Sequence, residues 1–376
     1  MIRFIFLLFY LSFLTVGFSQ TAKEYHIWGF AKFKRQDFKG AIEDYNKAID
    51  LNSKDPDLYI YRGAAKTKLQ DNLGAIEDYN RAIELNSKNA DAYFNRGFAK
   101  HELQDYKGAI SDYSKAIRLY SENAFKGILA YNCRGVAKMD IQDYEGAILD
   151  FNKAIESNPK SALGYINRGL ARSKLQNYKG AMQDYNKAIE LDPDNESLYF
   201  NRGLAKYELK DYKGAIQDHN KAIELNHKYA LAYMNRGLAK FELQNYKSAI
   251  KDYKKSIGLN HNNAQTYMNR GLAKYELGDY KGAIKDYNSS IILNPINSNA
   301  YCNLANTKAK LENNTGAIQD YNKAIELNPN YAFAYYNRGL IKDKLGDRNE
   351  ACMDFRKAAD IGLKQAKDLM KEYCNK

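Results

Sequence analysis

Apolar and polar positions follow one template that returns along almost the whole chain. The phrase YKGAI-x-DYNKAIELN and its variants recur every 34 residues, except for one step of 38 residues between Gly108 and Gly146. Ten copies of the template therefore cover residues 22–365, with four extra residues at 124–127. A period of this length is the signature of a helical repeat. The residue that marks the register is Gly40, Gly74, Gly108, Gly146, Gly180, Gly214, Gly282 and Gly316, with Ser248 and Glu350 in the other two copies.

Each copy predicts two helices joined by a turn. In the copy at 196–229, Tyr199, Gly203 and Ala205 fall on the first helix, and Ala215 and Ala222 fall on the second. Asp or Asn stands before every second helix, where its side chain can accept a hydrogen bond from a free backbone N–H. One copy cannot bury its apolar face alone, so we expect neighbouring copies to stack into a solenoid with a continuous core.

These aromatic and small-residue positions, repeated at a period of 34, resemble the tetratricopeptide-repeat family over nearly all of the chain. The resemblance implies an all-α fold, a tetratricopeptide-repeat solenoid of paired antiparallel helices wound into a right-handed superhelix. It places repeats 1–3 at 22–123, an insertion at 124–127, repeats 4–10 at 128–365, and the end of a C-terminal capping helix at 366–376.

The first 19 residues differ in character from the repeats. Arg3 gives a short basic start, residues 4–18 are almost wholly apolar, and Gly17 and Ser19 supply small residues before Gln20. This order is typical of a secretory signal peptide. The apolar run is shorter than the ~20 residues that a membrane-spanning helix needs, so we expect a signal peptide at 1–19. An uncleaved anchor is the alternative, and we expect no transmembrane span after signal cleavage.

Charge is spread over the repeats and not gathered in one arm. The chain has 57 Lys and Arg against 45 Asp and Glu, a formal net charge of +12. Every second helix carries an Asp, from Asp44 to Asp354, and every first helix carries a Lys or Arg, from Lys32 to Lys342. Because the opposite charges match in number, we expect a ladder of ion pairs inside the solenoid. An anion-binding stripe is the alternative.

The sequence offers no constellation for catalysis. It contains no G-x-S-x-G, no H-E-x-x-H and no phosphate-binding loop. Its five His share no metal-ligand spacing, and no Cys–His pair suggests a nucleophile. We therefore expect a protein that is not an enzyme and that has no cofactor and no metal site.

The resemblance also implies a binding surface, because the first helices of this family line the concave side of the superhelix. Stacked Asn side chains on that side resemble the asparagine ladder with which some long members hold the backbone of an extended peptide. An Asn amide both donates and accepts, so it can bond a peptide group without reading side chains. Apolar neighbours, Met among them, would supply burial. The peptide-binding groove predicted in this way consists of Asn167, Asn201, Asn235, Asn269, Phe200, Met234, Met268, Leu204, Leu238, Tyr207, Phe241 and Tyr275.

Packing is the alternative role for the same residues. The copies are so alike that the stripe can be a product of the repeat template, and its leucines can contact the next copy. The clamp with which this family binds acidic C-termini needs Lys and Asn at particular first-helix positions. Phe200 and Leu204 occupy such positions here, so we do not expect that activity.

Four Cys in 376 residues exclude a disulfide scaffold. Cys352 falls on the last second helix and Cys374 falls on the C-terminal cap. An antiparallel pair of helices would bring them to similar heights, so a disulfide is a hypothesis for an exported protein. Two free thiols are the alternative.

The sequence therefore predicts a non-enzymatic scaffold whose partner is another protein or an extended peptide. The signal peptide predicts export to the periplasm, or secretion to the cell surface. Two other function classes stay open. One is a binder of an anionic polymer, motivated by the net positive charge, with nucleic acid disfavoured because the charges are paired and the chain carries an export signal. The other is an accessory subunit of a separate enzyme.

Overall fold

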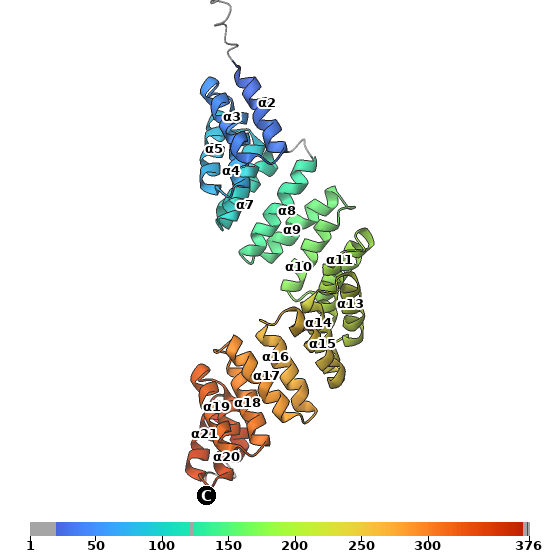
Figure 1. Cartoon of the computed structure of the whole chain (residues 1–376), viewed down its shortest axis with the longest axis vertical. Coiled ribbons are helices and arrows are strands. Elements are labelled where there is room, and N and C mark those ends of the chain that lie inside the picture. The colour runs from blue at the N-terminus through green and yellow to red at the C-terminus, as the bar shows by residue number, and fades with distance from the viewer. Residues whose placement is uncertain (1–19, 121–123, 371–373, 375–376) are drawn as a thin grey trace, which may run out of the picture. The chain divides into compact units, whose positions relative to one another are not determined.

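The computed structural model describes residues 20–120, 124–370 and 374, and these residues form helices and turns without any strand (Figure 1). The signal peptide predicted at 1–19 lies outside the described residues. The helices fall into two compact units, Met1–Leu191 with α2 to α11 and Asp192–Lys376 with α12 to α22. The all-α repeat fold predicted from the sequence is confirmed.

Each of the ten copies is a pair of helices that pack against each other. The first helices are α2 (Ala22–Lys34), α4 (Pro56–Lys68), α6 (Ala90–Glu102), α8 (Ala124–Asp140), α10 (Ala162–Lys174), α12 (Glu196–Glu208), α14 (Ala230–Glu242), α16 (Ala264–Glu276), α18 (Ser298–Lys310) and α20 (Ala332–Lys344). The second helices are α3 (Phe38–Leu51), α5 (Asn72–Leu85), α7 (Tyr106–Leu119), α9 (Tyr144–Ser157), α11 (Tyr178–Leu191), α13 (Tyr212–Leu225), α15 (Tyr246–Leu259), α17 (Tyr280–Leu293), α19 (Asn314–Leu327) and α21 (Arg348–Asp360).

The four extra residues at 124–127 lengthen a helix and do not form a loop. Helix α8 has 17 residues, whereas α6 and α10, the first helices on either side of it, have 13 each. The insertion therefore adds about one helical turn to the first helix of copy four.

Each second helix begins after an Asp or Asn, as the sequence predicts. In nine copies this side chain accepts a hydrogen bond from the backbone N–H three residues later. Asp211, for example, accepts from Gly214 N at 2.9 Å. A Cβ on Gly214 would collide with the Asp211 carboxylate as it lies here, so the glycine lets the cap lie close. Copy ten, with Glu350 at this position, keeps a longer cap of 3.3 Å. Where Ser248 replaces that glycine, the Asn245 side chain makes no cap hydrogen bond, and Ser248 N donates to the Asn245 backbone oxygen at 3.0 Å.

The two helices of a copy meet at small residues. Ala215 and Ala222 are completely buried. Beside them an aromatic ring of the second helix lies over the glycine of the first, and in copy six that ring is His219. A Cβ on Gly203 would lie 2.7 Å from His219 Cε1. The recurring glycine is therefore needed for close packing.

The turn between the two helices of a copy holds one residue in the left-handed region. Gln244, for example, has a φ of 60°. Two copies use Gly278 and Gly346 there, but eight use a residue with a Cβ, for which this region is unfavourable. Packing of the flanking helices must offset that strain. The eight residues are Gln36, Gln70, Gln104, Gln142, Gln176, Lys210, Gln244 and Glu312.

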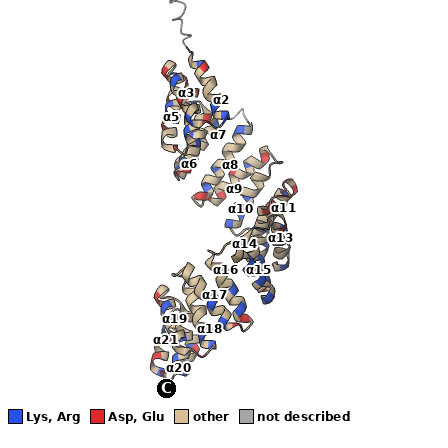
Figure 2. Ribbon diagram, in the orientation of Figure 1, with Lys and Arg blue, Asp and Glu red and all other residues tan. Residues whose placement is uncertain are grey.

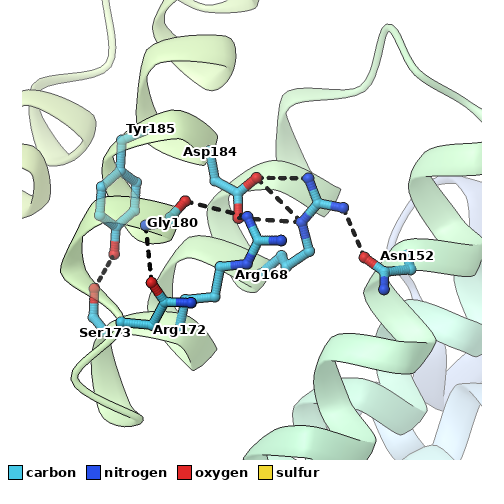
Figure 3. A network of polar contacts seen from close by, with 8 residues as sticks. Asn152, Arg168, Arg172, Ser173, Gly180, Asp184 and Tyr185 are labelled. Atoms are coloured by element: carbon cyan, nitrogen blue, oxygen red, sulfur yellow. Dashed lines mark hydrogen bonds and ion pairs between the residues drawn. The ribbon is translucent and has the colours of Figure 1, made fainter.

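The predicted ion pairs are present, and they compensate a buried Asp. Figure 3 shows Asp184 accepting from Arg168 at 2.6 Å and from Arg172 at 2.8 Å, while Arg168 also donates to Asn152 of the preceding copy at 2.7 Å. Eight copies bind their Asp with two cations in this way. The prediction of an ion-pair ladder is confirmed, so these cations do not form a free anion-binding stripe.

Copies one and nine depart from the ladder because Trp28 and Leu304 stand where the other copies have Arg. In copy nine Asp320 is paired with Lys308 at 2.6 Å. Burial raises the pKa of the Asp320 carboxyl, and Lys308 opposes that shift only in part. Copy nine therefore contains a less well compensated acid than its neighbours.

The C-terminal end of unit 2 is closed by helix α22 (Lys364–Leu369). Ala366 packs against Ala358 and Ala359 of α21. A disulfide joins Cys352 of α21 to Cys374, with the two Cα atoms 5.7 Å apart. This bond ties the chain beyond α22 to the last copy.

Candidate functional site

In each unit the first helices form the more tightly stacked side. Every first helix contacts the first helix of the next copy in its unit, as α12 does with α14 and α14 does with α16. Consecutive second helices make no comparable contact within the described ranges. All twelve groove residues predicted from the sequence lie on the first helices α10, α12, α14 and α16.

The Asn positions of the predicted groove differ from copy to copy. Asn201 is half-buried. Asn235 donates to the backbone oxygen of Leu231 at 2.9 Å. Asn269 is only 4% exposed, and its Oδ1 accepts from Gln265 Nε2 at 2.8 Å. The Asn269 amide is therefore closed to a ligand in this arrangement, and Asn201 is more accessible than Asn269.

Each apolar residue of the predicted groove is partly buried in the core and partly exposed to solvent. All eight of them are half-buried. Six of the eight pack against buried clusters within or between neighbouring copies, and they are Phe200, Met234, Leu238, Phe241, Met268 and Tyr275. These six side chains therefore pack in the core, and each also exposes part of its surface to solvent. Of the other two, Leu204 is half-buried and Tyr207 donates from its hydroxyl to Glu242 at 3.3 Å. Burial raises the pKa of Tyr207 to about 12.

A hollow of about 460 Å³ lies on the first-helix side of unit 2, between α16, α18 and α20. Of the predicted groove residues, Tyr275 lines it. The rest of its lining, which includes Asn306, Tyr321, Asn337 and Leu340, lies outside the twelve predicted groove residues. The signal was present in the sequence, because Asn306 stands where copies five to eight have Leu.

A second hollow, of about 310 Å³, lies in unit 1 between α6, α8 and α10. Asn167 of the predicted groove lines it, together with the apolar side chains of Phe98, Leu129, Val136 and Leu163. Three of these four are unusually exposed for their type, between 41% and 48%. The longer helix α8 forms one wall of this hollow, so the insertion at 124–127 marks its position in the sequence.

Outside the ion pairs, burial keeps one His and two Cys of the repeats neutral at pH 7. Burial lowers the pKa of His219 to about 4 and raises the pKa of the Cys133 and Cys302 thiols to about 11. A neutral thiol is a poor nucleophile. Among the described residues, no group of three or more His, Cys, Asp or Glu side chains is arranged to hold a metal ion. Within the same residues, no helix combines the length and the apolar character that crossing a bilayer demands.

Comparisons with known proteins agree with the repeat geometry. The family model described as "TPR repeat" matches residues 29–70, 63–104, 174–210, 203–244, 237–278, 271–312 and 308–346. Two models described as "Tetratricopeptide repeat" match residues 90–123, and residues 129–161 and 334–361. A search of curated proteins finds no match.

Two solved structures share the fold. A tetratricopeptide repeat protein from Parabacteroides merdae is 24% identical, covers 65% of this chain and 97% of its own length, and has a TM-score of 0.52. The Cut9–Hcn1 hetero-tetramer of the APC/C matches at 14% identity over 96% of this chain and 98% of that chain, with a TM-score of 0.50. YrrB, a TPR protein with an unusual peptide-binding site, is 26% identical over 50% of this chain and 97% of that chain, with a TM-score of 0.44. With its ten helix pairs and these family matches, the chain belongs to the tetratricopeptide-repeat family.

Proposed function

We propose that this chain is a non-enzymatic scaffold that binds another protein, or an extended peptide from it, along the first-helix side of its repeats. Proteins of this family are generally non-catalytic scaffolds that bind peptides or proteins. The observation that carries the proposal is the composition of α12, α14 and α16. Their half-buried apolar side chains stand beside Asn side chains of the same turns.

A peptide backbone suits this surface on physical grounds. An extended peptide presents an N–H and a C=O at each residue, and the Asn201 amide can bond both kinds of group. The exposed parts of Phe241, Met234 and Met268 lose solvent when a ligand covers them, which favours binding. Because Met is flexible and polarisable, such a surface adapts to different side chains.

Affinity capture from a cell-envelope extract of the source organism tests this proposal. The bait is the mature chain with mild crosslinking, beside a variant that carries Asn201→Ala, Asn235→Ala, Asn269→Ala and Phe241→Ala. The matched control is Asn288→Ala, which removes an exposed amide from the second helix α17. Circular dichroism checks that all three proteins keep their helix content. We expect a protein that the parent and the control retain and the groove variant loses; identical capture by all three would place binding elsewhere.

We also propose that the chain is exported to the cell envelope. The apolar segment at 1–19 has the order of a signal peptide. The disulfide between Cys352 and Cys374 supports the same compartment, because disulfides persist in oxidising environments. N-terminal sequencing of the protein from its source cells provides the test. A chain that starts at Gln20 is expected, and a chain that retains Met1 would mean that the segment is an anchor or is not used.

An anionic polymer is the second candidate partner, and one observation favours it. Helices α15 and α17 carry exposed lysines, and their only acids, Asp252 and Asp286, are already paired with first-helix cations. Figure 2 shows the basic positions on these two helices. The exposed lysines are Lys247, Lys251, Lys254, Lys255, Lys281 and Lys285.

Binding of a labelled DNA oligonucleotide and of labelled polyglutamate at two salt concentrations tests the second candidate. Neutralisation of phosphates makes affinity fall steeply between about 50 and about 200 mM salt. Replacement of Lys251, Lys254 and Lys285 by Gln should remove that binding, and Lys179→Gln with Lys213→Gln on α11 and α13 is the control. Equal binding by both variants would exclude this surface.

A further inference from the structure

The hollow of unit 2 lies where a pair of aromatic rings stands in the preceding copies. In copies six to eight, a ring in the last turn of the first helix packs edge-on against the Tyr that opens the second helix. The pairs are Tyr207–Tyr212, Phe241–Tyr246 and Tyr275–Tyr280, with ring centroids 5.3, 5.2 and 5.3 Å apart.

Copy nine lacks both rings, as copies two and ten also do. Ala309 stands at the first position and Asn314 at the second, and both line the hollow of about 460 Å³. One wall is the Tyr275 ring of copy eight, and another is formed by Leu340 and Ile341 of copy ten. A volume of this size lies in the range of small-ligand sites, which begins at about 300 Å³.

One end of the hollow is polar and fixed in orientation. Asn306 Oδ1 accepts from the Tyr321 hydroxyl at 2.5 Å and from Asn337 Nδ2 at 3.1 Å. Two donors on the oxygen determine which way the Asn306 amide faces, so its Nδ2 is left to donate to a guest. The Tyr321 ring is 1% exposed, and it anchors this arrangement in the core of copy nine.

The rim is basic. Lys310 at the end of α18 and Lys344 at the end of α20 are exposed and line the hollow, and among the described residues no carboxylate lines it. An ammonium group over an aromatic face is attractive. The chain already uses this contact in copy one, where Lys34 Nζ lies 5.2 Å from the centre of the Phe30 ring.

We propose that this hollow takes the aromatic side chain of a tyrosine from the bound partner, which restores the ring that copy nine lacks. The ring lies against Tyr275 and Leu340, its hydroxyl oxygen accepts from Asn306 Nδ2, and the rim lysines approach its face. An aliphatic side chain would leave the Asn306 donor unpaired, which is unfavourable in a half-buried site. The role of this tyrosine in partner binding rests on the function proposed above.

The test uses p-cresol, the analogue of the tyrosine side chain, as the probe. Methyl-labelled full-length protein reports binding through the NMR signals of Leu340 and Ile341. Ala309→Tyr is the blocking variant, and it should fold because copies six and eight carry Tyr at this position. Ser173→Tyr makes the same change in copy five and is the control.

The expected result is that p-cresol shifts both methyl signals in the parent and in the Ser173→Tyr control, and that Ala309→Tyr raises the Kd at least about tenfold. Toluene, which lacks the hydroxyl, should bind several-fold more weakly than p-cresol. Asn306→Leu, which restores the residue of copies five to eight, should remove that difference. Equal p-cresol binding by Ala309→Tyr, no binding by the parent, or equal binding of toluene by the parent would overturn the proposal.

The same variants separate this proposal from the function it rests on. If a captured partner loses affinity for the groove variant but not for Ala309→Tyr, the groove proposal stands and the tyrosine site is wrong. If p-cresol binds as expected but no partner depends on the groove residues, the hollow binds an aromatic ring and the proposed scaffold function is wrong.

Discussion

The ring of His219 lies directly against Gly203, so closely that a Cβ on the glycine would be 2.7 Å from His219 Cε1. Copies four and ten place Phe151 and Phe355 in the same relationship to their glycines, and six others place a Tyr there. His219 is completely buried, and neither of its ring nitrogens has a hydrogen-bond partner within the part of the chain that the structure describes. Burial lowers the pKa of His219 to about 4, so the ring is neutral at pH 7 in the folded repeat.

Acid should therefore destabilise copy six through His219. In the unfolded chain this His titrates near its ordinary pKa of about 6.5, so between that value and about 4 the unfolded chain binds more protons than the folded one. The stability is present above pH 6.5 and is lost as the pH falls toward 4. The difference between the two pKa values corresponds to roughly 3 kcal/mol.

Thermal unfolding of the parent and of His219→Phe between pH 7 and pH 4 tests this prediction. The variant has a natural precedent in Phe151 and carries no titrating group. We expect its midpoint to fall less than that of the parent below pH 6. His227→Gln, which removes an exposed His, should behave like the parent. Parallel curves for the parent and His219→Phe would contradict the prediction.

The turn between the two helices of a copy offers a stabilising substitution. Gln244 holds a φ of 60°, whereas the next copy has Gly278 with a φ of 78° at the same place. Because glycine adopts this conformation without a Cβ clash, Gln244→Gly should raise stability by about 1 kcal/mol. The reverse change, Gly278→Gln, should lower it by a similar amount. Thermal midpoints of the two variants check the signs, and two changes of the same sign would argue against backbone strain.

The period and the small residues were sufficient to predict the helix pairs, the caps and the ion-pair ladder, because each follows from local spacing. The left-handed turn was missed although Gly278 and Gly346 marked it, since eight copies place Gln, Lys or Glu there. The groove was harder to predict. Whether Asn269 faces a ligand or bonds with Gln265 depends on neighbouring side chains, which a repeat template does not specify. The hollow beside Asn306 arises from departures from that template.

Copy nine should become more stable when the Arg that its ion-pair ladder lacks is introduced. Leu304 is 3% exposed and stands where eight copies place an Arg against their Asp. Leu304→Arg would give the Asp320 carboxylate a second cation. The lost burial of Leu offsets part of the gain, so we expect a net stabilisation of up to about 1 kcal/mol at neutral pH.

The pH dependence gives the sharper test of that substitution. In the parent, burial raises the pKa of Asp320, so the folded chain holds this proton more tightly than the unfolded chain. The contribution of Asp320 to stability therefore falls as the pH rises above about 3.9, its ordinary value. The advantage of Leu304→Arg should grow from pH 4 to pH 7. Leu304→Met, which adds no charge, is the control, and an advantage that does not change with pH would exclude the ion-pair explanation.

The disulfide should stabilise one end of the molecule and leave the rest unchanged. Cys352 and Cys374 are 22 residues apart, and closing a loop of this size contributes about 3 kcal/mol in the chain-entropy model. In a repeat array each copy contacts only its neighbours, so the loss of this bond acts locally. The double variant Cys352→Ala and Cys374→Ala should exchange the amide hydrogens of α22 much faster than the parent. Those of α12 and α13 should be unaffected.

Reduction of the parent with dithiothreitol should reproduce the pattern, because Cys133 and Cys302 are already free. Unchanged exchange in α22 would mean that packing of Ala366 against α21 holds the helix without the bond. Faster exchange throughout unit 2 would mean that its copies unfold as one cooperative body.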